Sequence, residues 1–207
     1  KNLNGQRYYV NAEGDPVPSV TSILSKTKDM TALNAWKKRV GAAEAQRIVT
    51  ESANLGTIMH KHLESYIEGV ERPSGTNQVY VQAKNLSETV IEHGLKNVDE
   101  VWGIETHLAF PGLYGGTADL ICVHEGEPAI GDFKTSRKFK KKEWIDDYFM
   151  QASAYALAHN EVYGTNIQKG VIFMVTHDNQ YQQFVVEGDE FQTFTNCLLY
   201  TSDAADE

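Results

Sequence analysis

The chain has 207 residues, 41% of them hydrophobic and 23% charged, which is typical of an ordinary globular domain with one substantial core. It contains no run of 18 apolar residues, so no membrane partner is expected. The formal net charge of −9 argues against nucleic-acid binding as a bulk property, but six of the 19 basic residues lie within residues 134–142. An acidic protein can still present a locally positive groove.

The first half of the chain is expected to be mainly helical after an N-terminal hairpin. Residues 8–10 and 17–20 flank a Gly-Asp-Pro turn, and Ser19 or Thr21 is a candidate N-cap for the helix that follows. Gly56 is expected to interrupt the helical pattern, and Gly69 to end it. The predicted helices cover residues 21–24, 31–51, 57–68 and 79–92.

The second half changes to short apolar stretches bounded by Gly and Pro, which is typical of strands. The predicted strands are residues 98–109, 117–123, 129–134, 169–176 and 181–186. Helices are predicted over residues 146–161 and 189–199, and the acidic residues 201–207 are expected to be disordered. Helices followed by the order βββαββα indicate an α/β fold with a mixed sheet and an N-terminal helical lobe.

Only two cysteines occur, Cys122 and Cys197, and both have apolar neighbours. We expect two buried, reduced thiols, and no iron–sulfur cluster, which needs about four thiolates. Residues 1–7 lack the apolar stretch of a signal peptide. These features predict an intracellular, cytoplasmic protein.

Two acids interrupt apolar strands of the second half. Asp119 follows two glycines within an apolar run, and Asp132 follows another apolar segment and precedes Phe133 and Lys134. Buried carboxylates are costly unless they are paired or bind metal. Two carboxylates on adjacent strands, with the backbone carbonyl of Phe133, could bind Mg²⁺ or Mn²⁺, and Lys134 could orient a water or offset charge on a phosphate. The alternative is a surface strand that ends in solvated charge.

Helix periodicity adds two further pairs. His60 and Glu64 lie one turn apart, so His60 could be a metal ligand, and Glu64 could orient it or ligate the metal through water. The two could also be an incidental surface pair. Gln151 and Tyr155 could bond a DNA phosphate or hold Lys134, or Tyr155 could be a core aromatic. Glu105 is a candidate supporting acid or a plain surface residue.

A basic segment leaves directly from the candidate site, where an anionic substrate would enter. Phe139, Trp144 and Tyr148 could stack on bases of a single strand, or could belong to the core. A second basic group follows Trp36. The candidate DNA contacts of these two segments are Trp36, Lys37, Arg39, Thr135, Ser136, Arg137, Lys138, Lys140 and Lys141.

Four short motifs occur in the order G-T-x-x-H-x-x-x-E, G-G-T-A-D, D-F-K-T-S and Q-A-S-A-Y across residues 56–155. This ordered set resembles the RecB-type nucleases of the PD-(D/E)XK superfamily. The segment V-P-S-V-T-S-I-L and the Trp-Lys-Lys-Arg cluster resemble more closely the mitochondrial genome maintenance exonucleases and their bacteriophage relatives. The four-cysteine set of some RecB-type relatives is absent from this sequence.

The resemblance implies specific roles. Asp119 and Asp132 match the metal-binding acids, Phe133 the backbone ligand, Lys134 the catalytic lysine and His60 the motif histidine. Gln151 and Tyr155 match the motif after the core, and Ser19 and Thr21 fall in an element that could contact the strand. One structural unit is expected, with an N-terminal lobe over residues 1–95 and a nuclease core over residues 96–200.

The expected activity is a Mg²⁺- or Mn²⁺-dependent DNA exonuclease that prefers single strands. A structure-selective endonuclease, a duplex-reading restriction-type enzyme and a DNA-binding module without catalysis are the alternatives. DNA is the expected partner, together with a replication or recombination protein. We expect a monomer, of phage origin in a bacterial host.

Overall fold

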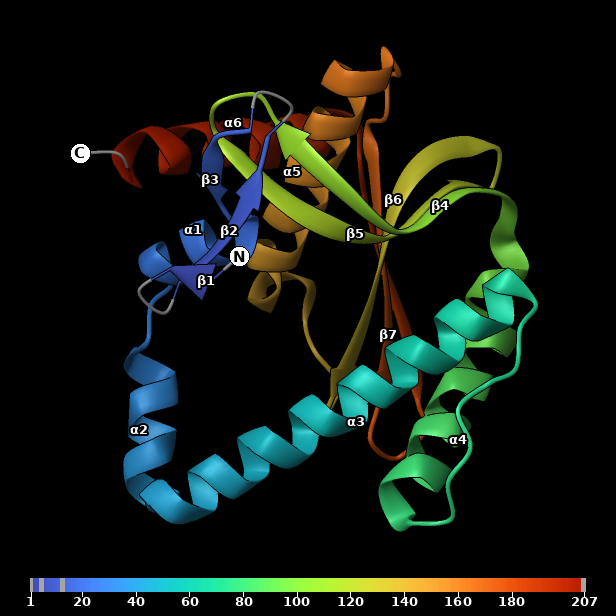
Figure 1. Cartoon of the computed structure of the whole chain (residues 1–207). Helices are drawn as coiled ribbons and strands as arrows, with labels where there is room; N and C mark the ends of the chain where they lie inside the picture. Colours follow the sequence, from blue (N-terminus) through green and yellow to red (C-terminus); the bar gives the residue numbers. More distant parts are fainter. Residues whose placement is uncertain (1, 4–5, 12–13, 206–207) are drawn as a thin grey trace.

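The computed structural model describes residues 2–3, 6–11 and 14–205 (Figure 1). Its first elements are three short antiparallel strands, β1 (Asn2–Leu3), β2 (Gln6–Val10) and β3 (Pro16–Pro18), so the predicted hairpin is confirmed. Ser19 is the N-cap of α1 (Val20–Thr27), since its hydroxyl accepts a hydrogen bond from the Ser22 N–H at 3.1 Å.

The helical segment breaks at Gly41, and the prediction of a break at Gly56 is wrong. Gly41 has φ +87°, which separates α2 (Thr31–Val40) from α3 (Ala42–Glu68). Gly56 stays helical, and a Cβ added there would lie 3.8 Å from Thr135 Oγ1. That distance is an ordinary van der Waals contact, so α3 packs against β6 at this point with room for a Cβ. Gly69 ends α3 in the left-handed conformation, as predicted.

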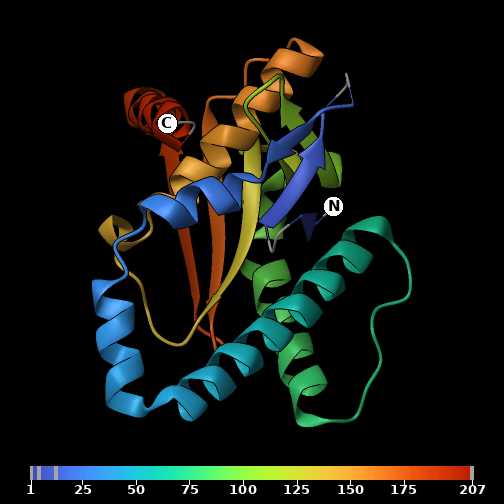
Figure 2. The same ribbon diagram turned by 60° about the vertical axis from the view of Figure 1, so that its left-hand side comes forward.

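Helices α2 and α3 form an arm that leaves the body of the molecule. No residue of α2 is buried. Figures 1 and 2 show α2 and the first half of α3 projecting beyond the end of the sheet. The chain returns through the connector before α4 (Gln78–His93), which packs on the second half of α3.

A five-stranded mixed sheet, in the order β4-β5-β6-β7-β8, forms the centre of the fold. Strands β4, β5, β6 and β8 pair antiparallel with a neighbour, and β6 pairs parallel with β7. That parallel pair is joined by a crossover through the 3-10 helix η2 (Lys142–Trp144) and α5 (Asp146–Tyr163). The strands are β4 (Val98–Phe110), β5 (Tyr114–His124), β6 (Glu127–Ser136), β7 (Lys169–Thr176) and β8 (Tyr181–Glu187), with a short 3-10 helix η1 (Leu95–Asn97) before the first. The predicted α/β order βββαββα is confirmed.

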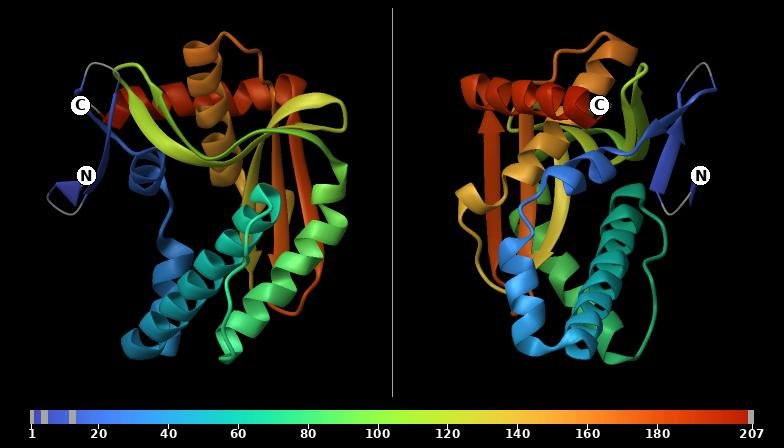
Figure 3. Two further views of the ribbon diagram at one scale, coloured as in Figure 1. Left: turned by 45° about the vertical axis from the view of Figure 1, so that its right-hand side comes forward. Right: turned by 90° about the vertical axis from the view of Figure 1, so that its left-hand side faces the viewer.

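Alternating side chains of the strands cover the two faces of the sheet. On β7, Val171, Phe173 and Val175 pack beneath α3 and α4, whereas Ile172 and Met174 face α1, α5 and α6. Figure 3 shows α3 and α4 together on one side of the sheet. Because this strand is buried along its whole length, it reads as a continuous apolar run in the sequence.

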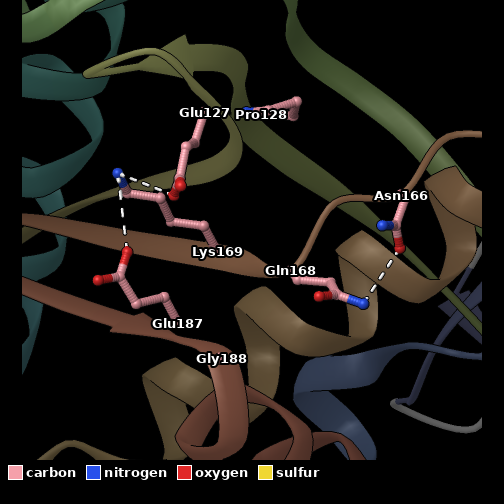
Figure 4. A pocket seen from close by; sticks show the side chains of 7 residues that line it. All are labelled: Glu127, Pro128, Asn166, Gln168, Lys169, Glu187 and Gly188. Atoms are coloured by element: carbon pink, nitrogen blue, oxygen red, sulfur yellow. Dashed lines mark hydrogen bonds and ion pairs between the residues drawn. The ribbon is translucent and has the colours of Figure 1, made fainter.

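The sheet end that holds the β5–β6 turn is closed by a buried lysine. Lys169 Nζ donates to the His124 carbonyl at 3.0 Å and lies 3.8 Å from Glu127 and 3.9 Å from Glu187 (Figure 4). Burial lowers the pKa of the neighbouring His124. The carbonyl and the two carboxylates compensate the buried charge of Lys169, which therefore has a structural role.

Helix α6 (Gly188–Ala205) runs beyond the predicted end at residue 199, and no glycine or proline interrupts the segment after Gly188. The prediction that both cysteines are buried is wrong for Cys197. Residues 206–207 lie outside the described part of the chain. Cys197 is exposed while Cys122 is buried, because Leu198 is the residue of that turn that faces the core. None of the helices in the described residues combines the length and apolar character that a membrane span requires.

Candidate active site

The two acids predicted from sequence lie where β5 and β6 separate. The antiparallel ladder between the strands ends at the pair Leu120–Gly131, one position before Asp119 and Asp132. Asp119 Oδ2 accepts a hydrogen bond from the Phe133 N–H at 2.9 Å and so connects the diverging strands. Because the two strands separate here, the side chains of Asp119 and Asp132 are not flanked by a continuous ladder of paired residues.

Asp132 and Lys134 form a buried ion pair on one face of β6. Lys134 Nζ lies 2.6 Å from Asp132 Oδ2, and Asp132 is 3% exposed. Burial raises the pKa of Asp132 to about 6, although Lys134 opposes the shift. Burial alone would lower the pKa of Lys134, but the charges of Asp132 and Asp119 raise it above its usual value. Lys134 is therefore a fixed cation, and the ring of Tyr148 lies 5.0 Å from its ammonium.

His60 reaches this site from α3. Its Nε2 lies 2.7 Å from the Phe133 carbonyl, so Nε2 carries the proton and donates it to that oxygen. In the neutral imidazole the lone pair is then on Nδ1, which lies 3.7 Å from Asp119 Oδ2. A metal-binding histidine commonly donates its other N–H to a backbone carbonyl in this way. In this structure the Phe133 carbonyl orients His60. The sequence predicted that carbonyl as a metal ligand and Glu64 as a group that could orient His60. Glu64 instead pairs with Lys61, at 2.9 Å.

Glu105 completes a cluster of three possible ligands with His60 and Asp119, whose donor atoms all lie within 4.8 Å of one another. Glu105 lies between the pairs Ile104–Leu120 and Thr106–Ala118, which places it opposite Asp119 on β4. Its φ of +46° is unusual for a residue with a Cβ. Burial and then the charge of Asp119 raise the pKa of Glu105. One imidazole nitrogen and carboxylate oxygens suit a divalent ion such as Mn²⁺ or Mg²⁺.

The cluster opens into a cleft of about 580 Å³ between α3, β4 and β6. Its lining includes His60, Glu105, Lys134 and Thr135. The cleft brings two of the possible metal ligands and the half-buried Lys134 to one surface. A phosphate group at this surface could contact both.

Gln151 and Tyr155 lie on α5, close to Asp132 and Lys134, but bond to each other. Gln151 Nε2 donates to Tyr155 Oη at 3.1 Å, and Tyr155 is 4% exposed. Its ring packs on Gly116, where an added Cβ would overlap a ring carbon. Tyr155 is thus a core aromatic with a polar tip. Tyr148, two turns earlier on the same helix, is the aromatic residue that contacts Lys134. Residues seven apart lie on the same face of a helix, so the position of Tyr155 in the sequence could have indicated Tyr148 as a neighbour of the site.

The candidate DNA contacts differ in exposure and in the pockets that they line. Ser19 is buried as a helix cap and Thr21 bonds to its hydroxyl at 3.1 Å, while Ser136 is buried and donates to the Lys138 carbonyl. Thr135 lines the cleft and Arg137 lines a second pocket. The remaining candidates are half-buried Trp36 and exposed Lys37, Arg39, Lys138, Lys140 and Lys141. Phe139 and Trp144 are 52% and 58% exposed on the same basic loop.

No known protein family matches this sequence, and no curated protein is significantly similar to it. Among solved structures, the chain is similar to a protein described as a "putative exonuclease" from Eubacterium rectale, with a TM-score of 0.52 and 13% identity. The match covers 72% of this chain and 64% of that structure, so this chain spans less than two-thirds of it. An alkaline exonuclease from Laribacter hongkongensis matches with a TM-score of 0.35 and 15% identity over 72% of this chain and 79% of the other. The first likeness shows a shared fold, and the α/β fold class predicted from sequence, a central mixed sheet flanked by helices, is confirmed.

Proposed function

We propose that this protein is a metal-dependent deoxyribonuclease that hydrolyses phosphodiester bonds and acts as an exonuclease on single strands. One observation carries the proposal: the His60–Glu105–Asp119 cluster shares a cleft with Lys134, which the buried Asp132 holds in place. The description of the structurally similar protein from Eubacterium rectale as an exonuclease points in the same direction.

The donor set fits a divalent cation, since it offers hard oxygens and one imidazole nitrogen with a free lone pair. A bound Mg²⁺ or Mn²⁺ would polarise the phosphodiester and lower the pKa of a water molecule. His60, Glu105 and Asp119 would hold that ion, with Asp132 as a further carboxylate at the edge of the cluster.

The protein's own groups would supply positioning and charge. Lys134 is a permanent cation at the cleft wall, so it would attract a phosphate and offset charge that develops on its oxygens. Asp132 and the Tyr148 ring fix the lysine, which limits its loss of side-chain freedom when substrate binds. Gln151 and Tyr155 would act through packing behind this pair, since Tyr155 is buried.

The preference for single strands is supported by the loop after β6. Phe139 and Trp144 are exposed beside exposed lysines, and Lys141 Nζ lies 5.4 Å from the Trp144 ring. Exposed aromatic faces next to cations suit unpaired bases, which can leave their stack, better than a closed duplex. The projecting α2–α3 arm adds Lys37, Lys38 and Arg39 near its tip.

Several finer expectations stay predictions. They are the division into an N-terminal lobe and a core, the closer relation to mitochondrial genome maintenance exonucleases, a monomeric state, a replication or recombination partner and a phage origin. The absence of an iron–sulfur cluster is expected from the sequence, which has two cysteines.

The test is a gel assay with end-labelled linear single strands, linear duplex and circular single strands, in Mg²⁺, Mn²⁺ or EDTA. We expect metal-dependent loss of the linear single strand, with the circle resistant. Asp132→Ala should abolish cleavage, and Glu161→Gln, an exposed change on α5 away from the cleft lining, should leave it unchanged. Cutting of the circle would instead show an endonuclease. No cleavage of any substrate by a folded wild-type protein would refute the proposal.

A further inference from the structure

Three polar side chains lie on the sheet beside the possible metal cluster, and the proposed chemistry does not use them. His107 lies two residues after Glu105 on β4. It pairs across the strands with Thr117, which lies two residues before Asp119 and on the same face of β5. Strand β2 lies against β5 (Figure 1) and brings Tyr9 to the same place.

A chain of hydrogen bonds joins these three side chains. Thr117 Oγ1 lies 2.8 Å from His107 Nδ1 and 3.2 Å from Tyr9 Oη. The rings of Tyr9 and His107 meet edge to face, with their centroids 6.0 Å apart. Tyr9 also packs closely on Gly115, where an added Cβ would overlap the tyrosine side chain. Packing therefore holds the three groups in place together with their hydrogen bonds.

The protons of this chain leave one donor unused. Thr117 has a single hydroxyl proton, which can go to only one of its two neighbours. If the proton goes to Nδ1 of a neutral His107, that ring carries its own proton on Nε2, and Tyr9 donates to Thr117. If it goes to Tyr9, His107 donates through Nδ1, and the tyrosine hydroxyl proton is unused. In both arrangements one N–H or O–H has no acceptor among the described residues.

His107 is the end of the chain that faces solvent. Its side chain is exposed, whereas Tyr9 and Thr117 are half-buried, and no other hydrogen bond of the described residues involves it. An acceptor that approaches from solvent would meet the Nε2–H of His107, with the two hydroxyls donating in series behind it. Glu105 interacts electrostatically with His107, and a metal ion bound to Glu105 would offset that negative charge. Hydroxyl and N–H donors commonly contact phosphate oxygens without reading sequence.

The distance from the cluster corresponds to about one nucleotide. Thr117 and Asp119 are two residues apart on β5, and two residues of extended strand cover about 7 Å. A nucleotide covers about 3.4 Å along the axis of a stacked strand, and more when the strand is unstacked. A phosphate at the metal cluster would therefore bring the next phosphate of an extended single strand within reach of His107.

We propose that His107, Thr117 and Tyr9 form a subsite for the phosphate next to the scissile one, with His107 Nε2 as the donor. The inference rests on the proposed function and deepens it, because it places the neighbouring nucleotide on the β4–β5 face beside β2. Binding of the neighbouring phosphate would fix the scissile phosphate at the metal cluster. Thr117 and Tyr9 are positioning residues, which act through His107 by fixing its tautomer and the orientation of its ring.

The first test is competition binding in Ca²⁺, an ion that takes oxygen ligands, so that binding is measured apart from cleavage in Mg²⁺ or Mn²⁺. The competitors are the thymidine trinucleotide and its two analogues with one neutral methylphosphonate linkage, each of which displaces a fluorescein-labelled octathymidylate. The wild type should bind both analogues about tenfold more weakly than the parent, since only the parent has charged phosphates for the cluster and for His107.

His107→Ala should bind the parent about tenfold more weakly than the wild type does, and should bind all three competitors alike, because each keeps one phosphate for the cluster. His107→Gln keeps an N–H donor and should recover most of the affinity. The matched control is His93→Ala, which removes an exposed histidine at the end of α4 and should behave like the wild type.

A second measurement identifies the proton of His107 in the trinucleotide complex, from long-range ¹H–¹⁵N spectra of the histidine side chains at about pH 8, where an ordinary imidazole is neutral. The proton should be on Nε2 in the wild type. Thr117→Val, which removes the hydroxyl that donates to Nδ1, should show both tautomers and bind the parent about threefold more weakly.

Several results would overturn the subsite. They are equal discrimination between the competitors by wild type and His107→Ala, a His107→Gln variant that binds no better than His107→Ala, a proton on Nδ1 in the complex, and failure of the wild type to bind the trinucleotide. A protein that binds as described in Ca²⁺ but never cleaves in Mg²⁺ or Mn²⁺ would refute only the proposed function. A protein that cleaves but binds the competitors equally with and without His107 would refute only the subsite.

Discussion

Replacing Asp132 by asparagine should stabilise the fold when no divalent metal is bound, although the same change should abolish cleavage. Asp132 is 3% exposed, and its buried position raises the pKa of its carboxyl group to about 6, even with Lys134 at 2.6 Å. Asparagine has nearly the same shape and carries no charge, and its amide oxygen can still accept a hydrogen bond from Lys134. The substitution therefore removes a buried charge and keeps an acceptor for the lysine.

The expected gain follows from the two pKa values of Asp132. In the unfolded chain the carboxyl titrates near 3.8, and in the folded protein near 6. At about 1.4 kcal/mol for each pH unit between them, the ionised carboxylate lowers the free energy of unfolding by about 3 kcal/mol. Below pH 3.8 the group is protonated in both states and this destabilisation is absent. It grows between pH 3.8 and 6 and is constant above pH 6.

The assay is urea unfolding in EDTA at about pH 4 and about pH 7.5, for wild type, Asp132→Asn and the exposed control Glu161→Gln. Asp132→Asn should be more stable by about 3 kcal/mol at the higher pH and nearly equal to wild type at the lower. Mn²⁺ should then stabilise the wild type and have less effect on Asp132→Asn, because the ion would lack a carboxylate. A variant less stable than the wild type at the higher pH would show that the Lys134 ion pair outweighs the burial of its charge, and would refute the argument.

Three further changes test separate parts of the molecule. His60→Gln should reduce cleavage at least about tenfold and shift the Mn²⁺ dependence to higher concentration, since His60 Nδ1 faces Asp119; an unchanged Mn²⁺ titration would make His60 a scaffold residue. Gly116→Ala should lower the free energy of unfolding by about 1–3 kcal/mol, because the new methyl group would overlap the Tyr155 ring; an unchanged urea midpoint would mean that the ring can move aside. Neutralising the three exposed loop lysines should make single-strand binding less sensitive to salt, by about 0.7 in slope for each phosphate that is no longer neutralised, and an unchanged slope would place the DNA elsewhere. These lysines are Lys138, Lys140 and Lys141.

The fold was predictable where a periodic pattern was long and uninterrupted. The strand β7 was predicted with its observed bounds, because its apolar run is buried on both faces. The helical region was harder to predict, since Gly41 and Gly56 are both glycines flanked by sequence of helical periodicity. Only the tertiary structure decides that Gly41 takes a positive φ and that Gly56 stays helical. Glycine permits both conformations, so the sequence does not distinguish a helix break from a glycine within a helix.

The sequence also predicted that Asp132 and Lys134 lie on the same face of their strand, because side chains alternate and residues two apart share a face. The partners that come from other elements were not predictable. Tyr148 and Tyr155 both lie on α5, but only the packing of Tyr155 against Gly116 leaves Tyr148 as the contact of Lys134. Likewise, the Phe133 carbonyl is an equally plausible metal ligand or histidine acceptor until α3 is placed against β6.

Glu105 shows why the third possible ligand could not be assigned from the chain alone. Its position opposite Asp119 depends on irregular pairing of β4 with β5, where the register shifts twice earlier in the strand, between Val98 and Glu100 and between Val101 and Gly103. A regular ladder counted from the pair Val98–His124 would place Glu105 opposite Thr117 instead of Asp119. These register shifts place Glu105, which has a positive φ, beside His60 and Asp119. Backbone strain of this kind persists only where the surrounding structure enforces it, and here the strained residue is the one that completes the cluster.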